Sequence, residues 1–263
     1  MRVLLTACLL GLLALPVQAQ TLWSRPYEPN QIAIEALVPD VGDDASALTG
    51  ATFVTGTVSL SENVELAAEL PVARYRPSAA GARTSTALGN PFVGLGLSST
   101  RIPLLFQLGA RLPVADANRA TTIGQATDVG RTPAFRPEEF ALSGLVNGRL
   151  EVGRYSTLRV RTGVEFGSRP SPSSPDRTQS WRLLYDAQLW REGDRLITGL
   201  SVTGRTRLSR PGTSEHHALL SVMGNWNVVQ PCLLAGTSLN DLFRRGTWTP
   251  IVGLTLSVSY GRL

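Results

Sequence analysis

The sequence is poor in the residues that mark several common classes of protein. Its 263 residues include no lysine, two histidines and two cysteines, Cys8 and Cys232, which is too few for a disulfide scaffold. All of its basic residues are arginines, no run of them marks a nucleic-acid surface, and the net charge is only +5. Charged residues make up 17% of the chain, too few for a coiled coil, and 43% hydrophobic residues exclude a disordered tail. We therefore expect a folded protein with no nucleic acid among its partners.

Long apolar runs are also absent, except at the N-terminus. Met1 and Arg2 precede an apolar run over residues 3–15, and the small-residue end at Ala19 completes the layout of a secretory signal peptide. We predict that residues 1–19 are removed and that residues 20–263 form one domain of an exported protein. The longest uncharged run after this signal, residues 218–240, contains Asn, Gln and Pro, so a membrane-spanning helix is not expected.

The most frequent pattern in the sequence is an alternation of apolar and polar residues, which is typical of strands with one apolar face. Leu158, Val160 and Phe166, for example, fall on one face of a strand, while the arginines between them fall on the other. About twelve such segments are expected, with boundaries good to within about four residues. They lie near residues 31–37, 49–60, 64–75, 89–98, 101–114, 139–151, 157–168, 179–190, 195–208, 215–228, 231–240 and 248–260.

The connections between these segments alternate in length. Short ones, such as residues 61–63 and 153–156, alternate with long ones, such as residues 115–138. Tight turns and long loops therefore lie at opposite ends of the sheet, which is the plan of a bacterial outer-membrane barrel. We predict an all-β protein: a transmembrane antiparallel up-and-down β-barrel of about twelve strands, with short periplasmic turns and longer extracellular loops.

A soluble β-sandwich would show the same alternation, so strand length and aromatic residues have to distinguish the two folds. Most of the segments are longer than the roughly five or six residues that are usual in a sandwich, and they suit a tilted membrane-spanning strand. Trp181, Trp190, Trp248 and Tyr260 lie near segment ends, as the aromatic girdles of a membrane barrel do. We expect the outer membrane of a Gram-negative bacterium as the location, with the lipid bilayer and the barrel-assembly machinery as partners.

Two neighbouring segments carry a resemblance to a known family. Gly89-Asn90-Pro91 opens one of them, and Gly109-x-Arg111-Leu112-Pro113 closes the next. This pair resembles the family of outer-membrane proteins named for the meta pathway of phenol degradation, whose members carry such a strand opening and strand ending. The resemblance covers these two segments and implies a channel or transporter for small aromatic or apolar compounds. It implies no catalytic residue.

Charged residues on the polar faces of the later segments are the candidate site. They are Arg149, Glu151, Arg159, Arg161, Glu165, Arg182, Asp186, Arg205 and Arg207, with Glu65 and Glu69 on an earlier segment. In one interpretation these charges line a narrow pore and favour anions, because arginine predominates. In the other, arginines and carboxylates pair across the ladder and fill a tight interior. A twelve-stranded lumen is intermediate between a packed core and an open channel, so both interpretations stand.

Residues suited to catalysis or metal binding are scarce. His216 and His217 are adjacent in a strand and point to opposite faces, so at most one could activate a serine such as Ser214 or Ser221. We expect no enzyme activity, no cofactor and no metal. The sequence predicts a narrow outer-membrane channel or transporter for small solutes. The alternatives are a barrel-embedded hydrolase that acts on lipid and a sealed structural barrel without transport.

Overall fold

The computed structural model of the protein describes most of the chain. The described residues are 30–42, 45–46, 48–79, 82–98, 103–171, 174–209, 214–226, 228–245 and 249–260. The expected signal peptide, residues 1–19, lies outside the described residues, as does Trp248.

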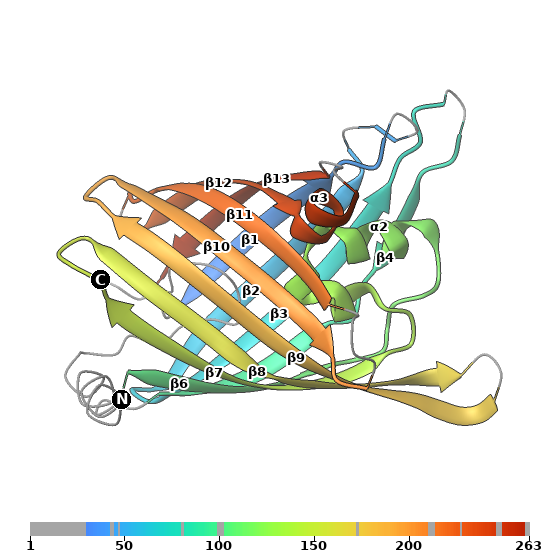
Figure 1. Ribbon diagram of the computed structural model, residues 1–263, viewed down its shortest axis with the longest axis horizontal. Coiled ribbons are helices and arrows are strands. Elements are labelled where there is room, and N and C mark those ends of the chain that lie inside the picture. The colour runs from blue at the N-terminus through green and yellow to red at the C-terminus, as the bar shows by residue number, and fades with distance from the viewer. Residues whose placement is uncertain are drawn as a thin grey trace.

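The strands form one antiparallel sheet that closes on itself (Figure 1). The strands are β1 (Gln31–Pro39), β2 (Gly50–Ser61), β3 (Val64–Tyr75), β4 (Ser85–Leu88), β5 (Phe92–Ser98), β6 (Leu104–Arg111), β7 (Phe140–Glu151), β8 (Ser156–Ser171), β9 (Ser174–Glu192), β10 (Leu196–Arg207), β11 (Ser214–Gly224), β12 (Val229–Ser238) and β13 (Pro250–Ser259). The last strand pairs with the first, in a register that runs from Gln31 opposite Ser259 to Pro39 opposite Ile251. Twelve strands close the barrel, and β4 is an addition at one end. The predicted barrel is therefore confirmed.

β4 and β5 are two halves of one broken strand. Both pair with β3, which meets β5 along its first half and β4 along its last four residues. The break falls at Gly89, Asn90 and Pro91, where the Gly89 amide donates to the Pro71 carbonyl at 2.8 Å. In an antiparallel strand, the N–H and C=O groups of one residue point to the same neighbouring strand. The Pro71 carbonyl faces the break, so the N–H that this proline lacks would face the break as well. Proline is tolerated there because no regular ladder bond is lost.

The outer surface of the barrel is apolar, because alternate residues of each strand point outward. On β13, Val252 and Leu254 are 53% and 55% exposed, whereas Thr255 and Ser257 between the outward residues are buried. Ile32 and Ile34 on β1, Val93 and the leucines of β5, and Leu200 on β10 continue this surface. A closed ladder with an apolar exterior leaves no polar backbone group facing lipid, as a membrane-spanning barrel requires. No helix of the described part is long and apolar enough to cross a membrane.

One predicted girdle residue points the other way. Trp181 lies on the outer face of β9 and is 51% exposed, as expected. Trp190 is 2% exposed and packs inside the barrel with Ile197 and Met223, so its assignment to an outer girdle was wrong. The reason is register, since Trp190 is an odd number of residues from Trp181 and so faces the lumen. It lies over Gly199, where an added Cβ would be 2.6 Å from the indole ring.

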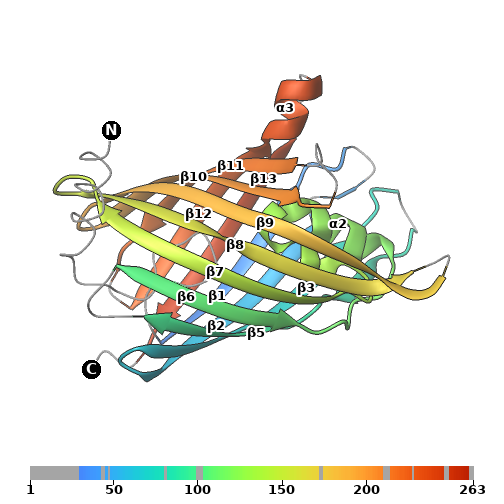
Figure 2. The same ribbon diagram turned by 60° about the horizontal axis from the view of Figure 1, so that its bottom comes forward.

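The long connection between β6 and β7 does not form an open extracellular loop. We call residues 112–139 the inner segment; they contain helix α2 (Arg119–Thr127) and the 3-10 helix η1 (Val129–Phe135). Helix α2 begins at a capping box, because Asn118 Oδ1 accepts from the Thr121 amide at 3.0 Å and Thr121 Oγ1 accepts from the Asn118 amide at 3.1 Å. Figure 2 shows α2 lying against the strands near one end of the barrel.

The inner segment packs on the inward face of the first strands. Helix α2 contacts β1 to β4. Phe135 of η1 meets Phe53 of β2 edge-on, with ring centroids 5.6 Å apart, and both rings are fully buried. Ala120, Ile123 and Ala134 complete this apolar cluster with Leu37 and Tyr75 of the wall. Burial of these side chains fixes the inner segment to one half of the barrel. A third helix, α3 (Leu239–Arg245), follows β12.

An arginine on the outer face in the middle of a strand should destabilise the barrel. Leu254→Arg places a charge near the bilayer midplane and should lower the free energy of unfolding by about 2–4 kcal/mol, measured by denaturant titration in lipid vesicles. Val258→Arg, on the same face close to the strand end, is the control and should cost only about 0–1 kcal/mol. Equal losses in both variants would contradict the predicted position of the membrane.

Candidate functional site

The structure directs the predicted site residues into the lumen from four adjacent strands, β7 to β10. Five of them, Arg159, Glu165, Arg182, Asp186 and Arg205, are buried. Arg149, Arg161 and Arg207 are partly exposed, and Glu151 is exposed at the end of β7. Within each strand these residues are an even number of positions apart, which accounts for their common direction.

Most of these charges are paired. Arg182 lies between Glu165 and Glu139 and donates from Nη1 to one carboxylate oxygen of each at 2.7 Å. Arg161 lies 3.9 Å from Asp186, while Arg149 and Arg159 both approach Glu192 at 3.5 Å. Glu139 directly precedes β7, and Glu192 is the last residue of β9. These two partners were therefore not among the predicted site residues. Pairing across the ladder therefore accounts for much of this set.

Arg205 is the exception in this group. Its side chain is buried on β10, and its Nη1 atom has no hydrogen-bond partner among the residues that the structure describes. Arg136 of the inner segment lies near it and reaches only Glu139, at 3.5 Å. Burial, together with the nearby positive charges of Arg205 and Arg182, lowers the pKa of Arg136 to about 9. This corner of the lumen therefore holds positive charge that its carboxylates compensate poorly.

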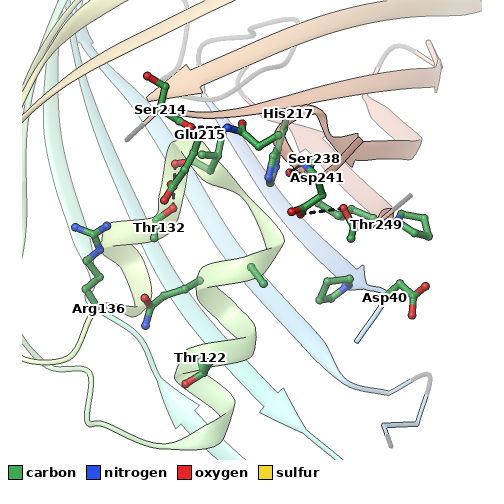
Figure 3. A pocket seen from close by; sticks show the side chains of 17 residues that line it. Asp40, Thr122, Thr132, Arg136, Ser214, Glu215, His217, Ser238, Asp241 and Thr249 are labelled. Carbon is green, nitrogen blue, oxygen red and sulfur yellow. Dashed lines mark hydrogen bonds between the residues drawn. The ribbon is translucent and has the colours of Figure 1, made fainter. Parts of the chain in front are cut away.

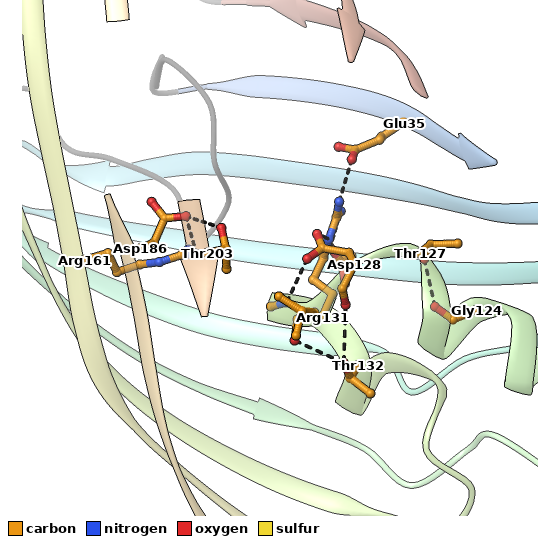
Figure 4. A network of polar contacts seen from close by, with 12 residues as sticks. Glu35, Gly124, Thr127, Asp128, Arg131, Thr132, Arg161, Asp186 and Thr203 are labelled. Atoms are coloured by element: carbon orange, nitrogen blue, oxygen red, sulfur yellow. Dashed lines mark hydrogen bonds and ion pairs between the residues drawn. The ribbon is translucent and has the colours of Figure 1, made fainter. Parts of the chain in front are cut away.

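The inner segment carries a buried arginine that binds the opposite wall (Figure 4). Arg131 donates to Glu35 of β1 at 2.5 Å and to Asp128 at 2.7 Å, and it lies 3.5 Å from Glu69 of β3. Its guanidinium also stacks 3.7 Å from the centre of the Phe53 ring. Burial alone would lower the pKa of Arg131, but the three carboxylates hold it above its ordinary value. An arginine surrounded in this way ties η1 to two strands at once.

Asn90, at the break between β4 and β5, holds both ends of the inner segment. Its Oδ1 accepts from the amides of Val114 and Ala115, each at 2.8 Å. Its Nδ2 donates to the carbonyls of Pro133 at 2.8 Å and Arg136 at 2.7 Å. The side chain is completely buried, so these bonds replace the water that it loses. The first matched motif, Gly89-Asn90-Pro91, thus has a structural role that the sequence did not reveal.

Arg111, from the second matched motif, completes this anchor. It donates to the Asn90 carbonyl at 3.0 Å and to Glu69 at 2.8 Å, and its guanidinium lies 5.3 Å from the centre of the Phe92 ring. Glu69 therefore joins Arg111 of the wall to Arg131 of the inner segment. The pair of motifs brings together the residues that support η1.

A cavity of about 690 Å³ separates the inner segment from β11, β12 and β13. Figure 3 shows Thr132 and Arg136 on its inner side, facing His217 and Asp241 from the wall and α3. Most of its lining side chains carry hydroxyl, amide or charged groups, and none is Phe, Tyr or Trp. The lining residues are Pro39, Asp40, Thr122, Gln125, Ala126, Val129, Thr132, Arg136, Ser214, Glu215, His217, Ser238, Asn240, Asp241, Thr249, Pro250 and Ile251.

A second cavity, of about 30 Å³, lies on the other side of η1. Gly130 lines it from the inner segment, and Arg161, Glu165 and Thr203 line it from strands β8 and β10. We call the larger space the outer cavity and the smaller one the inner cavity. Arg161 and Glu165, two of the predicted site residues, therefore line this inner cavity.

The two histidines point to opposite faces, as their adjacency requires. His216 Nε2 lies 2.5 Å from Tyr185 Oη, and its Nδ1 lies 3.1 Å from Asn240 Oδ1. Ser214 Oγ bonds to Thr206 Oγ1 instead, at 2.9 Å, and Ser221 Oγ donates to the Gly199 carbonyl. Neither serine is hydrogen-bonded to a histidine in the described part of the chain. The hydrolase alternative has no Ser–His pair there.

The described residues contain no group of three His, Cys, Asp or Glu side chains that could hold a metal ion. Cys232 is a free cysteine buried on β12. Its nearest cluster is apolar, with Trp190, Ile197 and Met223.

Comparisons with known proteins identify the fold. No family model matches the chain, and no curated protein matches its sequence. An outer membrane channel from Pseudomonas putida F1 superposes with a TM-score of 0.55 at 12% identity, covering 95% of this chain and 98% of that one. The KdgM porin gives a TM-score of 0.53 at 9% identity, over 88% and 99%. LpxR from Salmonella typhimurium gives 0.50 at 14% identity, over 88% and 100%. The chain therefore has the fold of an outer-membrane β-barrel.

Removal of the Arg131 charge should loosen the inner segment. Arg131→Met leaves Glu35, Asp128 and part of Glu69 buried without their cation, so we expect a loss of about 3–5 kcal/mol in the free energy of unfolding. Hydrogen exchange of α2 amides should rise as well. Arg83→Met, at an exposed position, is the control and should change stability by about 0.5 kcal/mol or less. Unchanged exchange in α2 would contradict this anchoring role.

Asp128 should make docking of the inner segment sensitive to acid. Burial alone would raise its pKa, but the Arg131 guanidinium and the Gly130 amide hold that pKa below its ordinary value. Its stabilising contribution is therefore complete above about pH 4 and is lost as the pH falls through the lowered pKa. Asp128→Asn should flatten the acid limb of a plot of unfolding free energy against pH. An unchanged slope would show that Asp128 does not titrate with unfolding.

Proposed function

We propose that the protein is a narrow outer-membrane channel for small solutes. The observation that carries this proposal is the polar interior of the barrel, in which charged strand residues surround two cavities beside an inner segment. A purely structural barrel could fill the same interior with apolar side chains at lower cost, since each buried charge loses hydration. The polar lining instead suits water and dissolved solutes.

The outer cavity supports polar solutes more than aromatic ones. The resemblance to the meta-pathway family implies small aromatic or apolar compounds. The lining of the outer cavity, however, offers hydroxyls such as Thr122 and Thr132, the amide of Gln125, and charges of both signs. An apolar compound would gain little there and would displace water from these groups. We therefore propose small polar solutes.

The predicted arginines would act on the far side of the inner segment. Arg149, Arg159 and Arg161 lie on β7 and β8, nearer to the short turn at residues 152–155 than the outer cavity is. Arg149 and Arg159 both lie 3.5 Å from the Glu192 carboxylate, and Arg161 lies 3.9 Å from that of Asp186. We propose that these groups favour anions among the ions that pass.

Conductance in planar bilayers tests this function. The folded protein should show small ion currents. Replacing residues 116–136 by a short Gly-Ser linker, with Glu35→Gln to avoid an unpaired carboxylate, should raise the conductance by about tenfold, because the lumen is widened. Heat-modifiable migration in detergent gels shows that each barrel is folded. If neither folded protein conducts ions, the channel proposal is wrong, and the sealed structural barrel is the remaining interpretation.

Charge selectivity provides a separate measurement. The combined change Arg159→Gln, Arg161→Gln and Arg205→Gln removes three lumen charges and should shift the permeability ratio toward cations by about two- to tenfold. Arg154→Gln, exposed in the turn between β7 and β8, is the matched control and should leave the ratio unchanged. An unchanged ratio in the triple variant would mean that these arginines only pair within the wall.

A further inference from the structure

The inner segment is fixed to the two sides of the barrel by different kinds of contact. Toward β1, β2 and β3 it buries the Phe53–Phe135 pair and the Arg131 ion pairs. Toward β10, η1 meets the wall where Gly130 faces Thr203. An added Cβ atom on Gly130 would lie 3.4 Å from Thr203 Cγ2, an ordinary van der Waals distance, so the space between the two residues would hold no more than a methyl group. No hydrogen bond or ion pair joins these two residues. On the β10 side, therefore, no polar bond holds Gly130 to Thr203, although Glu139 at the end of the inner segment binds Arg182 of β9.

Two consecutive residues of η1 line the two cavities. Val129 lines the outer cavity, and the next residue, Gly130, lines the inner one. Thr203 lines the inner cavity from the opposite side.

We propose, on the basis of the channel function, that solutes cross the barrel on the β10 side of the inner segment. The contact between Gly130 and Thr203 is the narrowest point of that route and sets the size of the solute that passes. The β1–β3 side is closed by apolar packing and by buried ion pairs, so displacement of the inner segment there would expose several unpaired charges. Separation at β10 breaks only a van der Waals contact.

The chemistry at the contact suits small solutes that carry hydroxyl or amide groups. Thr203 Oγ1 donates to Asp186 Oδ2 at 2.5 Å, and Arg161 lies 3.9 Å from that same oxygen (Figure 4). A guanidinium, a carboxylate and a hydroxyl thus lie side by side on the adjacent strands β8, β9 and β10. Gly130 has no side chain, so the backbone forms the opposite side of the constriction. The Gly130 amide donates to Asp128 Oδ1 at 2.8 Å.

Changes of size at the two positions test the route. Gly130→Leu should lower single-channel conductance by about tenfold, because an apolar side chain at a constriction also expels water. Thr203→Ser removes Cγ2 but keeps the hydroxyl for Asp186, and it should raise conductance by about twofold. Gly56→Leu is the matched control, because a Cβ there would meet nothing within 4 Å, and it should change nothing. Unaltered conductance in both test variants would overturn the route.

A reversible cross-link tests the same contact without a change of size. In a Cys232→Ala background, Gly130→Cys with Thr203→Cys should form a disulfide, since the two positions are in contact. Oxidation should lower conductance by about tenfold, and reduction should restore it. Failure of the cross-link to form, or a complete cross-link with full conductance, would overturn the proposal. Silence from both the wild-type protein and the variant without residues 116–136 would instead refute the channel function itself.

Discussion

The inability of lipid to form hydrogen bonds is the constraint on which this structure depends. Every backbone N–H and C=O group in the membrane must be paired within the protein, and only a closed ladder does this with strands. Pairing of β13 with β1 supplies that closure. Closure fixes the alternation of each strand, and alternation sends one set of side chains to lipid and the other to the lumen. The apolar exterior and the charged interior both follow.

Burial of charge inside the barrel has to be compensated by close partners, and the wall and the inner segment share this task. Glu69 of β3 binds Arg111 of β6 and Arg131 of η1, while Arg182 of β9 binds Glu165 and Glu139. An isolated charge of this kind would cost several kcal/mol. The lumen is therefore a network in which the inner segment is an integral member.

The sequence predicted the wall far better than the contents of the barrel. The expected segments coincide with the strands to within a few residues, with two exceptions. β4 lies where a loop was expected, and β8 and β9 continue to Ser171 and from Ser174, where another loop was expected. A two-residue period can be read locally, so strands such as β13 needed no tertiary information. Helix α2 has few apolar residues, among them Ala120 and Ile123, and its position depends on the shape of the wall. Its place in the lumen could not be predicted in this way.

The same limit applies to the candidate site. The inward direction of Arg159, Glu165, Arg182 and Asp186 followed from strand alternation alone. Their partners followed only in part, because Glu165 and Arg182 face each other in the ladder, whereas Glu139 comes from the inner segment. Nor did the sequence reveal that Asn90, in a motif noticed only for its resemblance, would bind backbone groups from residues 114–115 and 133–136 at once. That bonding has a consequence for how the inner segment is supported. The strands that α2 contacts, β1 to β4, all precede it in the chain, whereas η1 also packs against β10 and β11, so both halves of the polypeptide are needed to hold the inner segment in place.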